Sequence, residues 1–280
     1  MWMIRERPDV VIGVGGYASG PAVLAAKLLK VSTMVMEQNH YPGATNRWLA
    51  PRVDAVCLPS EAARARIGGR HFVTGNPVRR EFFEIGAPRF GDDLGLLVFG
   101  GSRGARSINR AMCAALDELS RVQPRLAIVH QTGTAEEENV RTAYATYPGA
   151  HEVRPFFEDM ATRFAQADLV VCRAGATTLS ELCAAGRPAI LVPFPHAADD
   201  HQSHNAETLR RAGAAVVLRD GELDGPSLAR TVVDLAGDPD RLRAMSRAAR
   251  TLARPDAAKK IADVADGLMR GRLEEDDDVS

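Results

Sequence analysis

Short runs of almost purely apolar residues recur along the chain and alternate with amphipathic stretches. Such runs are typical of parallel strands buried on both faces of a sheet. The predicted strands, most of which are such runs, lie at 9–14, 33–36, 55–58, 71–74, 96–99, 126–130, 151–153, 169–172, 189–192 and 215–218. The regular alternation of strand and helix predicts an α/β fold with parallel sheets in two lobes.

Helical patterns fill the spaces between these runs. After the run at 96–99, Ile108, Met112 and Leu116 share one face of a helix that ends near Leu119. The other predicted helices lie at 22–29, 46–50, 136–144, 159–167, 227–235, 239–252 and 255–269, with two more opening near 177 and 201.

Apolar periodicity lapses at 84–93, where Gly, Pro and charged residues accumulate. We place a domain linker there. The predicted lobes are residues 1–85, joined by the C-terminal helix 255–270, and residues 86–254. The acidic tail 271–280 is expected to be disordered and solvated.

The stretch 170–205 joins two strands to two helix starts. The strand at 169–172 breaks at Gly175, and the residues from Thr177 to Glu181 carry hydroxyls and an acid that suit a first helical turn. The strand at 189–192 leads to a loop rich in Pro, His and Asp and then to the helix near 201. Helix N-termini favour phosphate, so this crevice is a phosphate site or an ordinary strand-helix-strand unit without a ligand.

Two glycine-rich turns also link a strand to a helix, at 15–21 and 100–105. Such turns let backbone amides approach a phosphate, but GGSRGA at 100–105 is neither a Walker A loop nor a full dinucleotide fingerprint. A tight strand-to-helix turn explains 15–21 equally well. Glu37, Gln38 and Asn39 follow a strand directly, at the edge of a parallel sheet where ligands bind.

Composition narrows the class of protein. The 280 residues are 45% hydrophobic and carry a net charge of −1, which argues against general nucleic-acid binding. The four cysteines, Cys57, Cys113, Cys172 and Cys183, are dispersed in apolar runs and are expected to be free thiols in a reducing compartment rather than metal ligands. No apolar run approaches the roughly 20 residues of a spanning helix, so any membrane contact is expected to be peripheral.

Five ordered motifs resemble one family. They are GGYxSGP at 15–21, EQNxxPGxxN at 37–46, GNPVR at 75–79, GGSxGA at 100–105 and RxGAxTxSE at 173–181. Together they are similar to the MurG family of peptidoglycan N-acetylglucosaminyltransferases, which belong to glycosyltransferase family 28 and have the two-domain GT-B fold. The resemblance runs from residue 8 to residue 269.

The resemblance implies an inverting transfer of N-acetylglucosamine from UDP-N-acetylglucosamine to lipid I, the undecaprenyl-diphosphate-linked muramoyl-pentapeptide, to form lipid II. It implies an acceptor-side lobe at 1–85 and a donor-binding lobe at 86–254. No metal or other cofactor is implied, because helix N-termini and arginine can neutralise the leaving UDP. The implied location is peripheral, on the cytoplasmic face of the bacterial membrane.

The resemblance also assigns donor-binding residues. Glu181 would accept hydrogen bonds from the ribose hydroxyls, Ser102 and Arg79 would hold the diphosphate, and the backbone of Phe157 would read the uracil edge. Asn39 and Gln202 would bind sugar hydroxyls. Backbone amides for the diphosphate and the sugar would come from Ala176, Thr177, Thr178, Leu179 and Ser180.

The sequence departs from the family in its N-terminal part. The family carries a Gly-rich loop with a histidine, which supplies the catalytic base, upstream of the segment that matches 9–14. Nothing here corresponds to that loop, so we expect a truncated N-terminal lobe and assign no catalytic base, with His40 as an alternative. Met36 stands where many members have His, and Arg103 where many have Gln.

The sequence is compatible with three functions. The chain is a transferase recorded from too late a start, a donor-binding subunit that needs a second chain to complete its N-terminal lobe, or a UDP-sugar binding protein without catalysis. The strand at 9–14 would have one unpaired edge, which predicts self-association or dependence on a partner chain.

Overall fold

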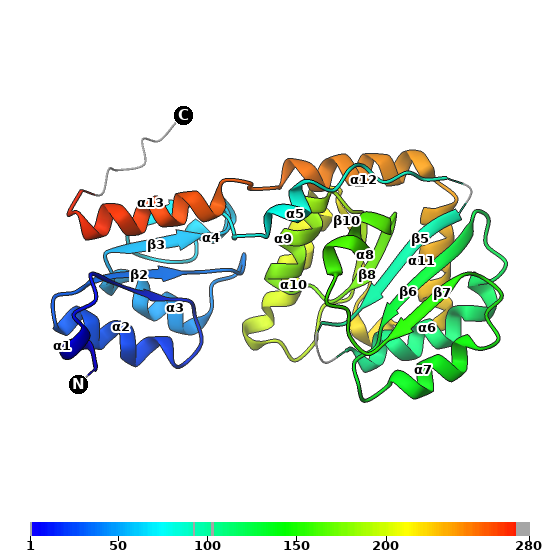
Figure 1. Ribbon diagram of the computed structural model, residues 1–280, viewed down its shortest axis with the longest axis horizontal. Helices are drawn as coiled ribbons and strands as arrows, with labels where there is room; N and C mark the ends of the chain where they lie inside the picture. Colours follow the sequence, from blue (N-terminus) through cyan, green and yellow to red (C-terminus); the bar gives the residue numbers. More distant parts are fainter. Residues whose placement is uncertain (1, 92, 102–103, 273–280) are drawn as a thin grey trace. The chain divides into compact units, whose positions relative to one another are not determined.

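The computed structural model describes residues 2–91, 93–101 and 104–272 and contains two parallel sheets (Figure 1). The predicted α/β class with two parallel-sheet lobes is confirmed. Ser102, Arg103 and most of the acidic tail, from Leu273 onward, lie outside the described residues. The chain forms two compact units, a first unit of residues 1–78, 197–204 and 254–280 and a second unit of residues 79–196 and 205–253.

The first unit holds a four-stranded sheet in the order β1-β2-β3-β4. Its strands are β1 (Val10–Gly13), β2 (Ser32–Met36), β3 (Ala55–Leu58) and β4 (His71–Val73), all parallel. Its helices are α1 (Trp2–Glu6), α2 (Ser19–Leu28), α3 (Ala44–Leu49), η1 (Ala50–Arg52), α4 (Glu61–Arg64), η2 (Ala198–Asp200) and α13 (Ala257–Met269). Among the described strands β1 pairs only with β2, so it is an edge strand.

The central strands β2 and β3 are buried on both faces of the sheet, which explains why each is an almost continuous apolar run. Val35, Val56 and Leu58 point to one face and pack in a cluster with Val23 of α2 and Leu49 of α3. The alternate strand residues pack against α13 on the other face. This second cluster contains Met34, Ala55, Cys57, Phe72, Ile261, Val264 and Leu268.

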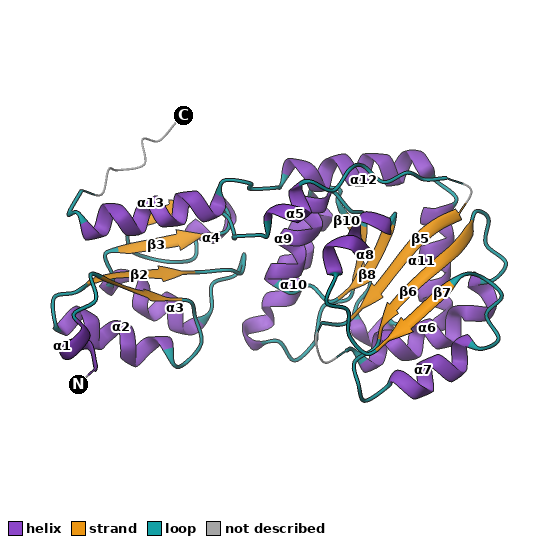
Figure 2. Cartoon of the chain, in the orientation of Figure 1, coloured by secondary structure: helices purple, strands orange, loops and turns teal. Residues whose placement is uncertain are grey.

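The second unit holds a six-stranded parallel sheet in the order β10-β9-β8-β5-β6-β7 (Figure 2). Its strands are β5 (Asp93–Phe99), β6 (Arg125–Gln131), β7 (His151–Arg154), β8 (Leu169–Cys172), β9 (Ala189–Leu191) and β10 (Ala215–Val217). Counted within the unit and read from β7, this is the 3-2-1-4-5-6 order of a Rossmann sheet. The strand order reverses between β5 and β8, and ligands bind outside the carboxyl ends of the strands at such a point.

Helices connect these strands and cover both faces of the second sheet (Figure 2). They are α5 (Arg80–Phe83), α6 (Arg106–Leu119), α7 (Glu137–Tyr144), α8 (Met160–Gln166), α9 (Ala176–Ala185), α10 (His201–Arg211, whose first four residues group with the first unit), η3 (Asp220–Glu222), α11 (Gly225–Ala236) and α12 (Pro239–Thr251). The predicted apolar face of α6 is buried in the main core, where Ile108, Met112 and Leu116 lie.

The carboxyl end of α9 is anchored by α12. Gly186 ends the helix with φ +60°, a left-handed conformation that favours glycine. Its carbonyl accepts a hydrogen bond from Ser246 Oγ at 2.8 Å, and Arg250 donates to the carbonyl of Ala184. These contacts fix the axis of α9 and hence the position of its N-terminus.

The segment predicted as a linker, 84–93, belongs to the second unit. The buried carboxylate of Asp168 accepts hydrogen bonds from the backbone N–H groups of Arg89 at 2.9 Å and Gly95 at 2.9 Å. The compact units divide at 78/79 rather than at 85/86, and residues 197–204 group with the first unit. Because Asp168 is far from this segment in the sequence, the local composition of 84–93 does not predict that the segment packs with the second unit.

Candidate functional site

The reversal of strand order in the second unit brings two loops together. The loop at 100–105 follows β5, and the loop at 173–175 follows the adjacent strand β8. Gly104 has φ +73°, and a Cβ there would lie 1.9 Å from the carbonyl oxygen of Thr132. Only glycine permits this approach, which packs the loop after β5 against the end of β6.

The N-terminus of α9 lies at this point and is not capped by a side chain among the described residues. Its N-cap is Gly175, in an extended conformation. The N–H groups of Ala176, Thr177 and Thr178 belong to the first turn and have no carbonyl one turn earlier to accept them. Exposed Thr177 and half-buried Thr178 therefore sit where an anion would find free donors and a favourable dipole.

Two of the predicted amide donors differ from the first three. The N–H of Leu179 already donates to the Gly175 carbonyl at 3.0 Å, and its side chain is buried. The N–H of Ser180 lies inside the helix, where the carbonyl of Ala176 is its acceptor one turn earlier, and Ser180 Oγ donates to the same carbonyl at 2.9 Å. The usable amides of this turn are therefore those of residues 176–178.

Glu181 lies one turn further along α9 and faces Arg79. The Arg79 Nη2 atom is 4.0 Å from Glu181 Oε1, and Arg79 also pairs with Glu81 at 2.9 Å. Burial raises the pKa of Glu181 above its ordinary value, against the opposing charge of Arg79, while Glu81 adds to the rise. Since 19% of the Glu181 side chain is exposed, this carboxylate is partly desolvated and still accessible.

Phe157 lies in the loop after β7 and is 3% exposed. Its backbone N–H donates to Gln131 Oε1 at 2.9 Å, and Gln131 Nε2 donates to the carbonyl of Gly101 at 3.1 Å. The guanidinium of Arg163 lies over the Phe157 ring, 4.5 Å from its centre. The N–H of Phe157 is therefore already used within the protein.

Arg173 forms a network beneath α9. Its Nη1 atom donates to Asp220 Oδ1 at 2.5 Å, and its Nη2 atom donates to Ser107 Oγ at 2.8 Å. Ser107 also donates to Asp220 Oδ1, at 2.6 Å. Burial acts to raise the pKa of Asp220, but the hydrogen bonds from Ser107 and Arg173 outweigh it and hold the pKa below its ordinary value. The network joins the exit of β8 to the starts of α6 and η3.

Asn39 and Gln202 lie in the first unit, and the other described site residues lie in the second. The backbone N–H of Asn39 donates to Glu37 Oε1 at 2.8 Å. Buried Glu37 also accepts hydrogen bonds from Gly43 N at 2.9 Å and from Asn46 Nδ2 at 2.9 Å. This carboxylate organises the loop from 38 to 46.

The same loop lines a cavity of about 330 Å³ within the first unit, together with Gly15, Gly16, Asp199 and His201. The side chain of Asn46 is 3% exposed, and its Oδ1 atom has no hydrogen-bond partner among the described residues. Gln202 follows His201 at the start of α10 and is half-buried. The cavity therefore combines glycine backbone with polar groups.

His40 follows Asn39 and is the alternative base. Its Nδ1 atom is 2.7 Å from Ser60 Oγ, and burial lowers the pKa of His40 to about 4. A general base works best with a pKa near the operating pH. His40 is therefore a weak proton acceptor in this environment.

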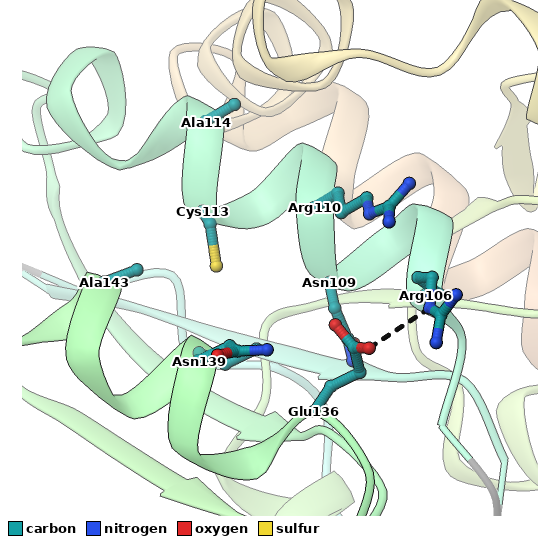
Figure 3. Close-up of a pocket in the computed structure, with 9 residues that line it drawn as sticks. Arg106, Asn109, Arg110, Cys113, Ala114, Glu136, Asn139 and Ala143 are labelled. Carbon is teal, nitrogen blue, oxygen red and sulfur yellow. Dashed lines mark hydrogen bonds and ion pairs between the residues drawn. The ribbon is translucent and has the colours of Figure 1, made fainter.

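Another cavity lies between α6 and α7, with a volume of about 530 Å³ (Figure 3). Arg106 and Glu136 pair across it at 3.1 Å, and the Cys113 side chain points into it. Burial raises the pKa of the Cys113 thiol, and the charge of Glu136 adds to the rise. No described donor-site residue lines this cavity, so it is separate from the donor crevice.

Within the described residues, no helix combines the length and the apolar character needed to cross a bilayer. The same part of the chain holds no group of three or more His, Cys, Asp and Glu side chains placed to bind a metal ion.

Known proteins match the chain over both units. The model of the glycosyltransferase family 28 C-terminal domain matches residues 95–261, and the model of the N-terminal domain of that family matches residues 1–58. A crystal structure of MurG from Acinetobacter baumannii is similar with a TM-score of 0.80 and 34% identity, over 95% of this chain and 76% of that one.

Curated relatives are more similar still. A protein of Myxococcus xanthus (strain DK1622), named UDP-N-acetylglucosamine--N-acetylmuramyl-(pentapeptide) pyrophosphoryl-undecaprenol N-acetylglucosamine transferase, is 48% identical over 274 residues, which cover 95% of this chain and 70% of the relative. A protein of the same name from Syntrophotalea carbinolica (strain DSM 2380 / NBRC 103641 / GraBd1) is 50% identical over 259 residues, or 92% of this chain and 72% of the relative. The chain belongs to the MurG family.

Membership of the MurG family confirms the predicted GT-B fold and the predicted glycosyltransferase class. The resemblance to MurG pointed to Arg79, Phe157 and Glu181 but not to Gln131, Ser107 or Asp220. The hydrogen-bond partners of Gln131 are 26 and 30 positions away, and Asp220 is 47 positions from Arg173. No local pattern in the sequence predicts these contacts.

Proposed function

We propose that the chain transfers N-acetylglucosamine from UDP-N-acetylglucosamine to N-acetylmuramyl-(pentapeptide) pyrophosphoryl-undecaprenol, the reaction that forms lipid II in peptidoglycan biosynthesis. The observation that carries this proposal is the 48% to 50% identity to transferases of that name over more than nine-tenths of the chain. The geometry of the second unit supports it, because a Rossmann switch point there presents donors for a diphosphate.

The diphosphate of the donor binds at the N-terminus of α9. The amides of Ala176, Thr177 and Thr178 donate to its oxygens, and the helix dipole stabilises the negative charge that grows as UDP leaves. Arg79 adds a guanidinium that remains charged at every physiological pH. Ser102, which lies outside the described residues, is a further donor in this proposal.

Two further groups hold the nucleoside in this proposal. Glu181 accepts hydrogen bonds from the ribose hydroxyls, a task for which an accessible carboxylate is suited. The carbonyl of Phe157 accepts the N3–H of uracil, because the Phe157 N–H is already donated to Gln131. Cytosine has no N3–H, so the same carbonyl would select against it.

Asn39 and Gln202 bind hydroxyls of the transferred sugar in this proposal. The acceptor is a polyprenyl diphosphate lipid, so the reaction takes place at the cytoplasmic face of the membrane, with the protein bound peripherally. The catalytic base remains unassigned, since His40, with a pKa of about 4, is a weak proton acceptor.

Calorimetry with UDP, together with transfer of radiolabelled N-acetylglucosamine to a lipid I analogue, tests the proposal. Glu181→Ala should weaken UDP binding by about 1 to 3 kcal/mol, because the ribose hydroxyls lose their acceptor. Glu118→Ala, the same substitution on an exposed face of α6, is the control. Preference for ATP or NAD over UDP would reject the donor, and equal UDP affinity in the Glu181 variant would reject the ribose contact.

A second function, donor binding in partnership with another chain, is favoured by one observation. The edge strand β1 has a free side in the described sheet, and Ile12 on it is 41% exposed. Strand edges of this kind pair with other chains. UDP binding without sugar transfer, restored by a second polypeptide, would support this alternative.

A further inference from the structure

Gln131 is the last residue of β6 and is 3% exposed. Its side chain bridges two loops that leave neighbouring strands. The Nε2 atom donates to the carbonyl of Gly101, after β5, at 3.1 Å. The Oε1 atom accepts from the N–H of Phe157, after β7, at 2.9 Å.

The two partners dictate the orientation of this amide. The Gly101 carbonyl can only accept a hydrogen bond, and the Phe157 N–H can only donate one. The position therefore needs a side chain with a donor and an acceptor side by side at its end. An ionised Glu lacks the donor and Met offers neither group, although both have nearly the same length as Gln.

The backbone around Gln131 is held independently of its side chain. His130 Nε2 is 3.1 Å from Asn109 Oδ1, and Asn109 Nδ2 donates to the carbonyl of Thr132 at 2.9 Å. The N–H of Thr132 donates to the carbonyl of Arg154 at 2.9 Å. These contacts tie the end of β6 to α6 and β7, so Gln131 projects from a fixed point.

We infer that Gln131 is a positioning residue for the nucleotide of the donor. It sets the spacing between the Gly101 loop, on the phosphate side, and the Phe157 backbone, on the base side. This inference rests on the proposed function, because it takes the ligand of these loops to be a uridine diphosphate. Loss of either hydrogen bond frees one loop from the other and weakens both affinity and base selection.

The test compares dissociation constants for UDP and CDP by calorimetry in the full chain. Gln131→Met should raise the UDP dissociation constant about tenfold, the factor that corresponds to one net hydrogen bond of about 1.4 kcal/mol. It should also reduce the preference for UDP over CDP. Gln166→Met, the same change on the exposed surface of α8, should alter neither quantity.

Gln131→Glu tests the hydrogen-bonding role of this side chain directly, because the effect of this substitution on UDP affinity should depend on pH. At pH 8 its carboxylate repels the Gly101 carbonyl, so UDP should bind as weakly as in Gln131→Met. Toward pH 5 the protonated carboxyl regains a donor for Gly101 while its other oxygen accepts from Phe157. UDP affinity, expressed relative to the wild type at each pH, should therefore recover as the pH falls.

The outcomes separate the inference from the proposed function. A wild-type chain that does not bind UDP would overturn the proposed donor, and with it the premise of the inference. A wild type that binds UDP, beside a folded Gln131→Met variant of equal affinity and base preference, would overturn only the role of Gln131. If Gln131→Met does not fold, a Gln131→Glu variant whose relative affinity is independent of pH would overturn that role instead.

Discussion

Arg173 and Asp220 meet at 2.5 Å although 47 positions separate them in sequence. Their side chains are 13% and 21% exposed, so the pair is largely desolvated. Arg173 stands directly before the turn that starts α9, and Asp220 opens η3 after β10. The pair therefore ties the segment before α9, which follows β8, to the segment that follows β10.

Asp220→Asn should destabilise the protein by about 1 to 3 kcal/mol at pH 7, because Arg173 and Ser107 lose a charged acceptor. The folded pKa of Asp220 lies below its ordinary value, so this stabilisation is complete above the unfolded pKa of about 3.9 and is lost as the pH falls through the folded pKa. Urea unfolding at pH 7 measures the effect. Asp240→Asn, whose side chain is 96% exposed, should change stability little.

Glu181→Gln should separate binding from stability. Burial raises the pKa of Glu181, which means that the ionised form costs stability at pH values above the folded pKa. The variant should therefore resist urea better than the wild type at pH 7.5 without ligand, while it binds UDP more weakly. A variant that is less stable and binds UDP normally would show that Glu181 is a structural residue.

The same carboxyl predicts a pH dependence of binding. As the pH falls through the raised pKa of Glu181, the protonated carboxyl accepts hydrogen bonds poorly and UDP affinity should decline. UDP titrates too, so the useful quantity is the ratio of wild-type to Glu181→Gln affinity at each pH. A ratio that stays constant from pH 8 to pH 4 would contradict the assignment.

His130 should make the protein sensitive to mild acid. It is fully buried between Tyr144 and Asn109, and burial lowers its pKa to about 3. Above the unfolded pKa of about 6.5, His130 is neutral in both the folded and the unfolded state and does not reduce stability. Below that pH the free energy of unfolding falls by up to about 1.4 kcal/mol per pH unit, because the unfolded state binds a proton that buried His130 does not. Urea unfolding at several pH values should show this slope in the wild type.

Two variants isolate the titration of His130 from its hydrogen bond. Tyr144→Phe leaves His130 Nδ1 without its partner and should lower stability at pH 7 while it keeps the pH slope. His130→Gln should reduce the slope itself. If both variants keep the wild-type slope, the acid sensitivity arises from another group.

Glu37→Gln should loosen the loop from 38 to 46. One oxygen of Gln replaces two of Glu, and the new NH₂ group faces the donors of Gly43 or Asn39. The expected cost is about 2 to 3 kcal/mol, the range for hydrogen bonds to a charged acceptor. Faster hydrogen exchange of amides 38–46 would show it, and Glu61→Gln, with a side chain 69% exposed, is the control.

The regular elements could be predicted from the sequence because burial leaves a direct pattern. Leu169–Cys172 is buried at every position, and a short apolar run of this kind predicts a strand even when the neighbouring strands are unknown. Helices of four or five residues, such as α4 and α5, contain too few turns for a periodic pattern and were not predicted. The segment 84–93 was predicted to be a linker because the side chain that holds it, Asp168, lies far away in the sequence.

The resemblance to MurG predicts donor-binding residues, but it does not predict the contacts that arrange them. Thr177 and Glu181 lie within one helix turn, so their relation is visible in the sequence. The contact between Arg79 and Glu181 and the bridge made by Gln131 depend on how β5, β6, β7 and β8 are ordered in the sheet. Strand order is a property of the whole unit, which no short stretch of sequence encodes.

The packing of α13 on the first sheet has a consequence for how the protein is made. Met34, Ala55 and Phe72 are synthesised early, whereas their partners Ile261 and Val264 leave the ribosome only after the whole second unit. One apolar face of the N-terminal sheet must wait, uncovered, while the second unit completes its own core. The nascent chain is therefore expected to need chaperone protection of β2, β3 and β4, and the docking of α13 is the step that commits the first unit to its folded state.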